Sequence, residues 1–165
     1  MINIAIAEDN NIALNTLKEK LSAFPDIILK HTAKNGKEAI ENIETSSEID
    51  ILLMDIEMPE MNGIDATEKI KKQYPQVKIV MITIYDDDDY IFNAIKAGAD
   101  SYILKDTKAE KIYETITDTL NGGSVMSPSI AIKALQLLKN AAHIKYFSKQ
   151  DVPLRARRAF PQKRQ

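Results

Sequence analysis

The sequence predicts an α/β protein built on a doubly wound, five-stranded parallel sheet with helices on both faces. Short apolar runs alternate five times with longer amphipathic stretches, and this strict alternation is typical of parallel strands joined by helices. Two of the runs, IDILLM and VKIVMI, are almost continuously apolar, as strands buried on both faces are. A length of 165 residues permits one compact domain with an extension, but not two full domains.

The first helix lies between two strands and has clear boundaries. Residues 2–7 (INIAIA) predict the first strand, which stops at a pair of acids. Asn10 or Asn11 can cap the helix that follows, whose apolar residues have helical spacing, and Pro25 lies beyond its end. The apolar run at 27–33 predicts the second strand.

The middle of the chain holds the two most apolar strands. Asn35-Gly36 turns the chain into the second helix. Residues 49–54 predict the third strand, and residues 77–82 predict the fourth. The helix between these two strands reaches about Tyr74 and is broken by the proline that follows it.

Glycines end the last two helices of the domain. We expect a helix at 87–97 that is closed by Gly98, and a fifth strand at 101–104. A further helix follows this strand and is stopped by Gly122-Gly123. The run DDDD near the start of the first of these helices could suggest a second metal site. A capped helix N-terminus with acids in its first turn accounts for it more simply.

The charges divide the chain into an acidic body and a basic tail. Residues 1–142 carry 15 Lys, no Arg and 23 Asp or Glu, for a net charge of −8, whereas residues 143–165 carry seven Lys or Arg and one Asp, for a net charge of +6. We predict a domain at 1–122, a linker region at 123–142 whose helix covers about 128–140, and a tail that is disordered, truncated or non-native. Arginines suggest nucleic-acid contact, but 23 residues cannot hold a helix-turn-helix.

The composition excludes several classes of protein. The absence of cysteine excludes a disulfide framework and a thiolate metal site. No apolar run approaches the roughly 18 residues that a membrane span needs, and no basic segment precedes a signal-type core at the N-terminus. We therefore expect a cytoplasmic protein that has no membrane partner.

Residue types that suit phosphoryl chemistry gather just after the predicted strands. Glu8 and Asp9 follow the first strand, Asp55 the third, Thr83 the fourth and Lys105 the fifth. Ligands of an open parallel sheet bind beyond the carboxyl ends of its strands, so the three carboxylates converge if the first and third strands are neighbours. Clustered carboxylates repel one another unless a cation joins them, and oxygen ligands alone favour Mg²⁺. An aspartate beside such an ion can attack phosphorus, which predicts a phosphoryl-acceptor site.

The same positions resemble the receiver domains of two-component response regulators. The resemblance covers residues 1 to about 122. It rests on the acid pair after the first strand, MDIEMPEMNG at 54–63, Thr83 after VKIVMI, and AGADSYILKD at 97–106. It implies the flavodoxin-like (CheY-like) fold, with strand order 2-1-3-4-5 and a C-terminal linker helix.

The resemblance implies a role for each acid of the site. In the family pattern, Asp55 matches the residue that is phosphorylated. Asp9, Asp55 and the backbone carbonyl of Glu57 ligate Mg²⁺ directly, and Glu8 acts mainly through bound water. Taken alone, Asp55 is also compatible with a helix cap or a loop acid, and the other site residues in register argue against this.

The resemblance also implies a conformational switch. Thr83 matches the hydroxyl that moves toward the phosphoryl group, Lys105 matches the lysine that pairs with it, and Tyr102 matches the aromatic residue that swings inward. Thr83 could instead be a turn residue, and Tyr102 a static core aromatic. One departure from the family pattern is Asp106, which follows Lys105 where many receivers have proline.

Three segments are similar to the NarL/FixJ branch of the family, whose members are transcription factors with a C-terminal LuxR-type helix-turn-helix. They are Lys105-Asp106, AGADSYILKD and GGSVMSPSIAIKAL. The branch implies a sensor histidine kinase as phosphoryl donor and a homodimer formed on phosphorylation through the face of the fourth helix, fifth strand and fifth helix. DNA binding and transcription regulation would need an output domain that this sequence lacks, and the tail would be a truncated, frameshifted or vector-encoded end.

Two other functions use similar residues. A haloacid-dehalogenase-type phosphatase also has an aspartate nucleophile and Mg²⁺, but it resembles D-x-D-x-T or D-x-D-x-V at the first strand, whereas Asp55 follows the third. A stand-alone receiver would signal through protein contacts or pass its phosphoryl group onward, and the linker-like helix argues against it. We therefore expect a signalling switch with intrinsic Mg²⁺-dependent autophosphorylation and autodephosphorylation, and not an enzyme.

Overall fold

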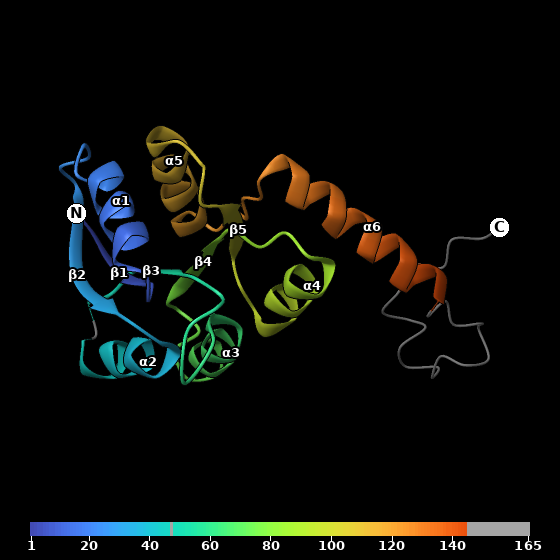
Figure 1. Ribbon diagram of the computed structural model, residues 1–165, viewed down its shortest axis with the longest axis horizontal. Coiled ribbons are helices and arrows are strands. Elements are labelled where there is room, and N and C mark those ends of the chain that lie inside the picture. The colour runs from blue at the N-terminus through green and yellow to red at the C-terminus, as the bar shows by residue number, and fades with distance from the viewer. Residues whose placement is uncertain (47, 145–165) are drawn as a thin grey trace.

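The computed structural model describes residues 1–46 and 48–144, and it contains five strand–helix units followed by a sixth helix (Figure 1). The strands are β1 (Ile2–Ala7), β2 (Ile27–Ala33), β3 (Ile51–Met54), β4 (Lys78–Thr83) and β5 (Ser101–Leu104). The helices are α1 (Asn11–Leu21), α2 (Gly36–Thr45), α3 (Gly63–Gln73), α4 (Asp88–Ala97), α5 (Ala109–Leu120) and α6 (Pro128–Ile144). The predicted alternation is confirmed.

All paired strands of the sheet run parallel, in the order β2-β1-β3-β4-β5. This is the order that the resemblance implies, and it places β1 beside β3. Ala7 at the end of β1 pairs with Met54 at the end of β3. The N–H of Asp55 donates a hydrogen bond to the Ala7 carbonyl at 3.0 Å. The acids that follow these two strands therefore start side by side.

A different set of helices covers each face of the sheet, because alternate residues of a strand point to opposite faces. On one face, α1 and α5 pack against residues such as Ile4 and Ile6. On the other, α2, α3 and α4 pack against residues such as Ala5 and Ala7. Burial on both faces explains why β3 and β4 are almost wholly apolar.

Asparagines begin three of the helices. Asn10, Asn35 and Asn62 each accept a hydrogen bond from the backbone N–H three residues later. The sequence left both Asn10 and Asn11 open as the cap of α1, and the structure selects Asn10. Gly98, with a φ of 105°, ends α4 as predicted, because a left-handed backbone favours glycine.

Several element boundaries differ from the prediction by one or more residues; α4, for example, begins at Asp88 instead of at 87. β3 begins at Ile51, two residues late, and β4 begins at Lys78, because the Val77 N–H first closes a turn onto the Tyr74 carbonyl at 3.0 Å. α6 continues to Ile144, past the expected end at 140 and past the expected start of the tail at 143. The rest of the predicted tail lies outside the described residues.

The linker helix α6 packs against α4 instead of standing free (Figure 1). Ile130 is fully buried in the core next to α4. The Lys133 ammonium donates a hydrogen bond to the Asp86 carbonyl at 2.8 Å, and ahead of α6 the Tyr102 N–H donates to the Val125 carbonyl at 2.9 Å. The linker therefore also covers the edge of β5.

Among the described residues, no helix, α6 included, is long and apolar enough to cross a bilayer.

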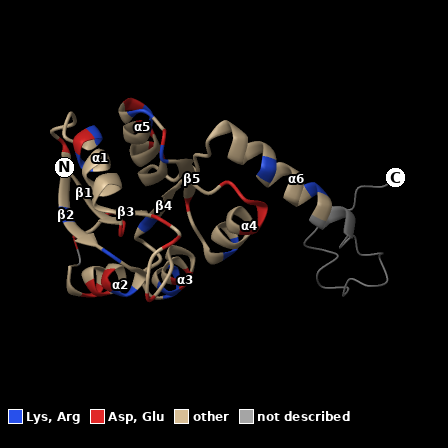
Figure 2. Ribbon diagram, viewed as in Figure 1, with Lys and Arg blue, Asp and Glu red and all other residues tan. Residues whose placement is uncertain are grey.

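The acidic run 86–89 leads into α4 beside α6 (Figure 2). Asp88 and Asp89 lie in the first helical turn, where the helix dipole favours negative charge, so this part of the prediction is confirmed. Asp87 takes the N-cap position, but its side chain makes no capping hydrogen bond, so the predicted side-chain cap is wrong. Asp86 forms an ion pair with the Lys133 ammonium at 3.5 Å, which offsets part of the negative charge of the acidic run. The sequence had indicated no partner for this charge.

Candidate functional site

Three carboxylates converge at the carboxyl ends of β1 and β3. Glu8, Asp9 and Asp55 each offer one oxygen, and these oxygens lie within 4.8 Å of one another. Glu8 and Asp55 are 4% and 5% exposed, whereas Asp9 is exposed to solvent. The structure thus brings together the acids that the sequence singled out, because β1 and β3 are neighbours in the sheet.

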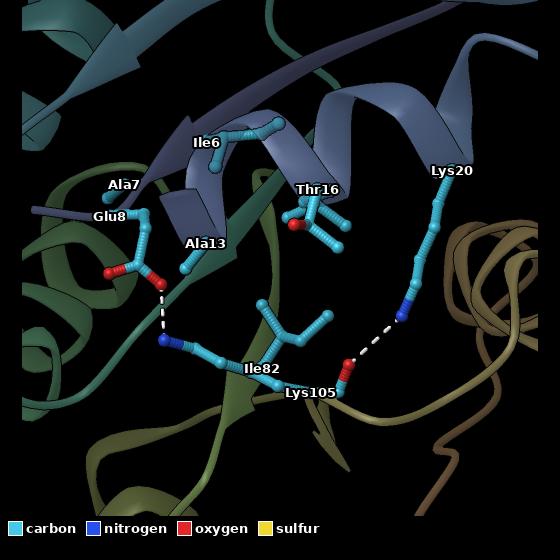
Figure 3. Close-up of a pocket in the computed structure, with 9 residues that line it drawn as sticks. Ile6, Ala7, Glu8, Ala13, Thr16, Lys20, Ile82 and Lys105 are labelled. Carbon is cyan, nitrogen blue, oxygen red and sulfur yellow. Dashed lines mark hydrogen bonds and ion pairs between the residues drawn. The ribbon is translucent and has the colours of Figure 1, made fainter. Parts of the chain in front are cut away.

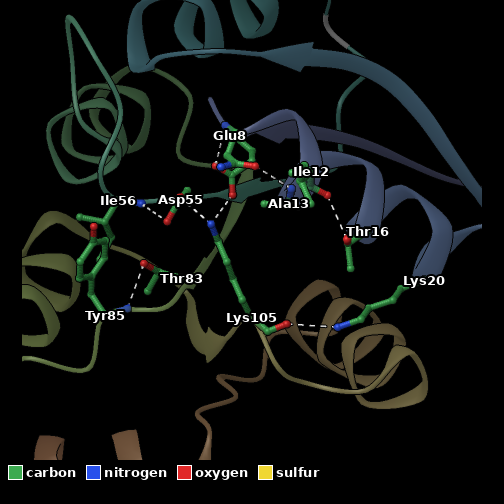
Figure 4. A network of polar contacts seen from close by, with 11 residues as sticks. Glu8, Ile12, Ala13, Thr16, Lys20, Asp55, Ile56, Thr83, Tyr85 and Lys105 are labelled. Atoms are coloured by element: carbon green, nitrogen blue, oxygen red, sulfur yellow. Dashed lines mark hydrogen bonds and ion pairs between the residues drawn. The ribbon is translucent and has the colours of Figure 1, made fainter.

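Lys105 lies across the two buried carboxylates (Figure 4). Its ammonium donates a hydrogen bond to Oδ2 of Asp55 at 2.9 Å and forms an ion pair with Glu8. Lys105 follows β5, two strands away from β3, and its own N–H donates to the Thr83 carbonyl at 3.0 Å. One ammonium therefore offsets part of the repulsion between two buried acids.

Burial and charge act in opposite directions on these groups. Burial raises the pKa of the Glu8 carboxyl, the hydrogen bond from Lys105 lowers it, and the charge of Asp55 raises it further, so that the net direction is upward. Burial alone would lower the pKa of the Lys105 ammonium, but its hydrogen bonds to Glu8 and Asp55 outweigh this, and the pKa is raised. Lys105 is therefore held firmly as a cation.

The backbone around Asp55 is fixed by a close approach to the start of α3. Oδ1 of Asp55 accepts a hydrogen bond from the Ile56 N–H at 2.8 Å. A Cβ atom on Gly63 would lie 1.8 Å from the Asp55 carbonyl oxygen, and the Gly63 N–H donates to the Ile56 carbonyl at 2.7 Å. The loop can close in this way only because residue 63 has no side chain. The sequence analysis gave Gly63 no role, and the pair Asn62-Gly63 was the signal that could have revealed one.

Thr83 and Tyr102 both contact Tyr85. Thr83 is fully buried, and its Oγ1 accepts a hydrogen bond from the Tyr85 N–H at 3.3 Å (Figure 4). Tyr102 is 1% exposed, and its hydroxyl donates to the Tyr85 carbonyl at 2.5 Å. Burial raises the pKa of the Tyr102 phenol, which therefore stays a neutral donor. In this structure the Tyr102 side chain therefore lies inward, and it bonds to the main chain of Tyr85, as Thr83 does.

The Glu57 side chain joins the loop after β3 to α4. Its carboxylate accepts a hydrogen bond from the Tyr90 hydroxyl, which lies 33 residues away in the sequence. This hydrogen bond raises the pKa of Tyr90 to about 12. The Tyr90 and Tyr85 rings also pack together, with centroids 5.0 Å apart. The sequence analysis missed Tyr90, because nothing near it in the chain indicates a partner.

Replacing Glu57 with Gln is expected to lower the pKa of Tyr90 toward the ordinary value near 10. Because the fold favours the protonated phenol, this contribution to stability is present below about pH 10 and is lost as the pH rises through about 12. Tyrosinate absorbance at about pH 11 should therefore be higher in Glu57→Gln than in wild type. Tyr90→Phe gives the reference without this phenol, and equal absorbance in wild type and Glu57→Gln would contradict the prediction.

The donor set of the cluster fits a hard divalent cation. All of its donor atoms are oxygens, which are the ligands that Mg²⁺ prefers. Three carboxylates and one ammonium carry a formal charge of −2, which a divalent ion would neutralise. The exposed Asp9 leaves one side of the cluster open to solvent.

Known proteins with similar sequences and structures share this architecture. The response regulator receiver domain family matches residues 4–117. Response regulator protein VraR of Staphylococcus saprophyticus is 36% identical over 143 residues, which make up 87% of this chain and 68% of the relative.

Two solved structures extend the similarity to the fold. A two-component response regulator of the LuxR family from Aurantimonas sp. has a TM-score of 0.75 and 25% identity, covering 81% of this chain and 95% of that chain. A CheY-like response regulator receiver domain protein from Methanospirillum hungatei has a TM-score of 0.67 and 29% identity, covering 74% of this chain and 95% of that chain. The chain is similar to regulators of the LuxR family and to a CheY-like receiver alike.

Proposed function

The chain belongs to the response regulator receiver domain family, and we therefore propose that Asp55 receives a phosphoryl group in two-component signalling. The observation that carries the proposal is the placement of Asp55. Its carboxylate is buried beside two other acids, with one oxygen on the Ile56 N–H and the other on the Lys105 ammonium. Prearranged donors of this kind can stabilise the charge that develops during transfer.

The proposed reaction is a transfer from a phosphohistidine of a sensor histidine kinase. A carboxylate oxygen of Asp55 attacks the phosphorus, a P–O bond forms and the P–N bond breaks. The electron pair of the broken bond stays on the imidazole, which takes up a proton. Lys105 then pairs with the phosphoryl oxygens, and the Thr83 hydroxyl donates to one of them. The groups of the chain act on its own Asp55, and we therefore propose a signalling switch with autophosphorylation and autodephosphorylation and not an enzyme that acts on other molecules.

The residues proposed to hold Mg²⁺ are Asp9, Asp55 and the backbone carbonyl of Glu57, with Glu8 acting through bound water. The convergence of three oxygen donors and their excess negative charge support this assignment. When bound, Mg²⁺ neutralises charge on the phosphoryl oxygens. Asp9 is the exposed member of the cluster and is therefore the acid that an arriving ion can reach first.

Thr83 and Tyr102 are proposed to transmit the change in phosphorylation to the surface. Both form a hydrogen bond with the main chain of Tyr85. Thr83 accepts from the Tyr85 N–H, and Tyr102 donates to the Tyr85 carbonyl. When Thr83 turns toward the phosphoryl group, its hydrogen bond with the Tyr85 N–H breaks. The Tyr85 main chain can then shift, and this shift alters the hydrogen bond between the Tyr102 hydroxyl and the Tyr85 carbonyl. Phosphorylation would thus bias an equilibrium between two arrangements that both exist beforehand.

The proposed partners follow from the branch of the family that the chain resembles. We expect a cytoplasmic protein with residues 1–122 as receiver, followed by a linker region that contains α6 (Pro128–Ile144) and then by the basic tail. Phosphorylation would favour a homodimer through the face of α4, β5 and α5, part of which α6 already contacts. DNA binding and transcription regulation would belong to an output domain of the intact protein. Similarity to a LuxR-family regulator supports this part of the proposal.

Intact-mass spectrometry after incubation with acetyl phosphate tests the proposed function. With Mg²⁺ the chain is expected to gain one phosphoryl group, and with EDTA in place of Mg²⁺ it is expected to gain none. Hydroxylamine should remove the added group, because it cleaves acyl phosphates and leaves phosphate esters intact. If no gain occurs under conditions that modify a well-behaved receiver, the chain is not a phosphoacceptor.

A further inference from the structure

We propose that Lys20 is a positioning residue of the phosphoryl-transfer site, because it holds the turn that carries Lys105. The proposal rests on the proposed function and adds to it a residue outside the acidic cluster. Lys20 lies in the last turn of α1 and reaches the turn after β5, which is 85 residues further along the chain. Among the described residues its ammonium bonds to main-chain carbonyls and not to the carboxylates, so it would act on them through Lys105.

The Lys20 ammonium makes two hydrogen bonds to main-chain carbonyls of this turn. It donates to the carbonyl of Lys105 at 3.1 Å and to the carbonyl of Thr107 at 2.9 Å. Figure 3 shows the first of these bonds on one side of Lys105 and the pairing of the Lys105 ammonium with Glu8 on the other. The main chain of Lys105 is therefore held by α1 while its side chain extends to the acids.

A cavity lies on the side of the turn that faces α1. Its volume is about 140 Å³, and it is lined among others by Thr16, Lys20, Ile82 and Lys105 (Figure 3). On the other side the Lys105 N–H donates to the Thr83 carbonyl at 3.0 Å. Because a cavity provides few packing contacts, the hydrogen bonds from Lys20 contribute support to the turn from the side of α1.

The position of the Lys105 backbone decides where its ammonium lies. The Lys105 ammonium must reach Asp55 and Glu8 at the same time, and later the phosphoryl oxygens in their place. If the Lys105 and Thr107 carbonyls lose their donor, the turn can shift into the cavity and carry the side chain with it. A small displacement of a charged group at a reacting centre slows the reaction strongly.

Rates of phosphoryl gain from acetyl phosphate with Mg²⁺ test this proposal in the full chain. Lys20→Met keeps the length of the side chain and removes the donor, and it is expected to slow the gain by roughly tenfold. Lys20→Arg restores a charged donor to the carbonyls and is expected to recover most of the rate. Lys18→Met removes an exposed lysine from the same helix turn and is expected to match wild type.

Two further measurements separate positioning from a general effect of charge or stability. In a Lys105→Met background, Lys20→Met is expected to cause no additional slowing, because the group that it positions is gone. Backbone NMR of Lys20→Met is expected to show shifted amide signals at 105–107, while thermal unfolding shows the chain still folded at the assay temperature. These signals should not shift in Lys18→Met.

The possible outcomes distinguish this proposal from the proposed function. If wild type gains no phosphoryl group, the proposed function fails. If wild type reacts and Lys20→Met reacts equally fast, only the role of Lys20 is wrong. Equal slowing in Lys20→Met and Lys18→Met, or slowing that persists undiminished in the Lys105→Met background, would show a field effect of charge and would also overturn the positioning role.

Discussion

Asp55→Asn is expected to abolish the uptake of a phosphoryl group while the chain stays folded. The amide has nearly the shape of the carboxylate, so that its oxygen can still accept the hydrogen bond from the Ile56 N–H. It lacks the negative charge that makes a carboxylate oxygen a nucleophile toward phosphorus. Intact-mass spectrometry with acetyl phosphate and Mg²⁺ should therefore show no gain in this variant, against one phosphoryl group in wild type.

The stability of Asp55→Asn is expected to differ little from that of wild type. The change removes the Asp55 charge that raises the pKa of Glu8, and this removal favours folding. It also puts an amide NH2 group in place of the oxygen that accepts from the Lys105 ammonium, and the loss of this hydrogen bond opposes folding. These effects oppose each other, and we expect a net change within about 1 kcal/mol. Asp106→Asn, in an exposed acid next to Lys105, serves as the matched control and should be phosphorylated normally. Undiminished phosphoryl gain in Asp55→Asn would mean that another residue is the acceptor.

Gly63→Ala is expected to cause the largest loss of stability among the changes considered. The added Cβ would lie 1.8 Å from the Asp55 carbonyl oxygen and 2.8 Å from Cγ of Met54, so the backbone at the end of β3 must move. Overpacking of a buried site commonly costs up to about 3 kcal/mol, and contact with backbone places this variant at the upper end. In thermal unfolding this corresponds to a decrease of roughly 10 °C.

The site should respond to Gly63→Ala together with the fold. Displacement of the Asp55 backbone also displaces its carboxylate, so we expect slower phosphoryl gain even where the variant is folded. Gly122→Ala is the control: its φ of 92° is unfavourable for alanine, but nothing lies within 4 Å of the added Cβ. Its cost should stay near 1 kcal/mol, the strain of a left-handed alanine. If Gly63→Ala melts no lower than Gly122→Ala, the close approach is not what Gly63 is needed for.

The order of the elements and the members of the acidic cluster could be predicted from the amino-acid pattern alone. Strands and helices differ in the spacing of their apolar residues, and this spacing is a local property that can be counted along the chain. Parallel strands end on the same edge of a sheet, so residues that follow strands, such as Glu8, Asp55 and Lys105, are brought together once the strand order places β1 beside β3.

The distant groups that support this cluster became visible in the folded chain and could not be predicted beforehand. Lys20 meets the Lys105 carbonyl across 85 residues, Tyr90 meets Glu57 across 33, and Lys133 meets the Asp86 carbonyl across 47. The docking of α6 on α4 and the clearance that Gly63 gives to Asp55 are of the same kind. No local pattern predicts such contacts, because each depends on how two helices or loops pack on the sheet and on a side chain that is just long or short enough to fit.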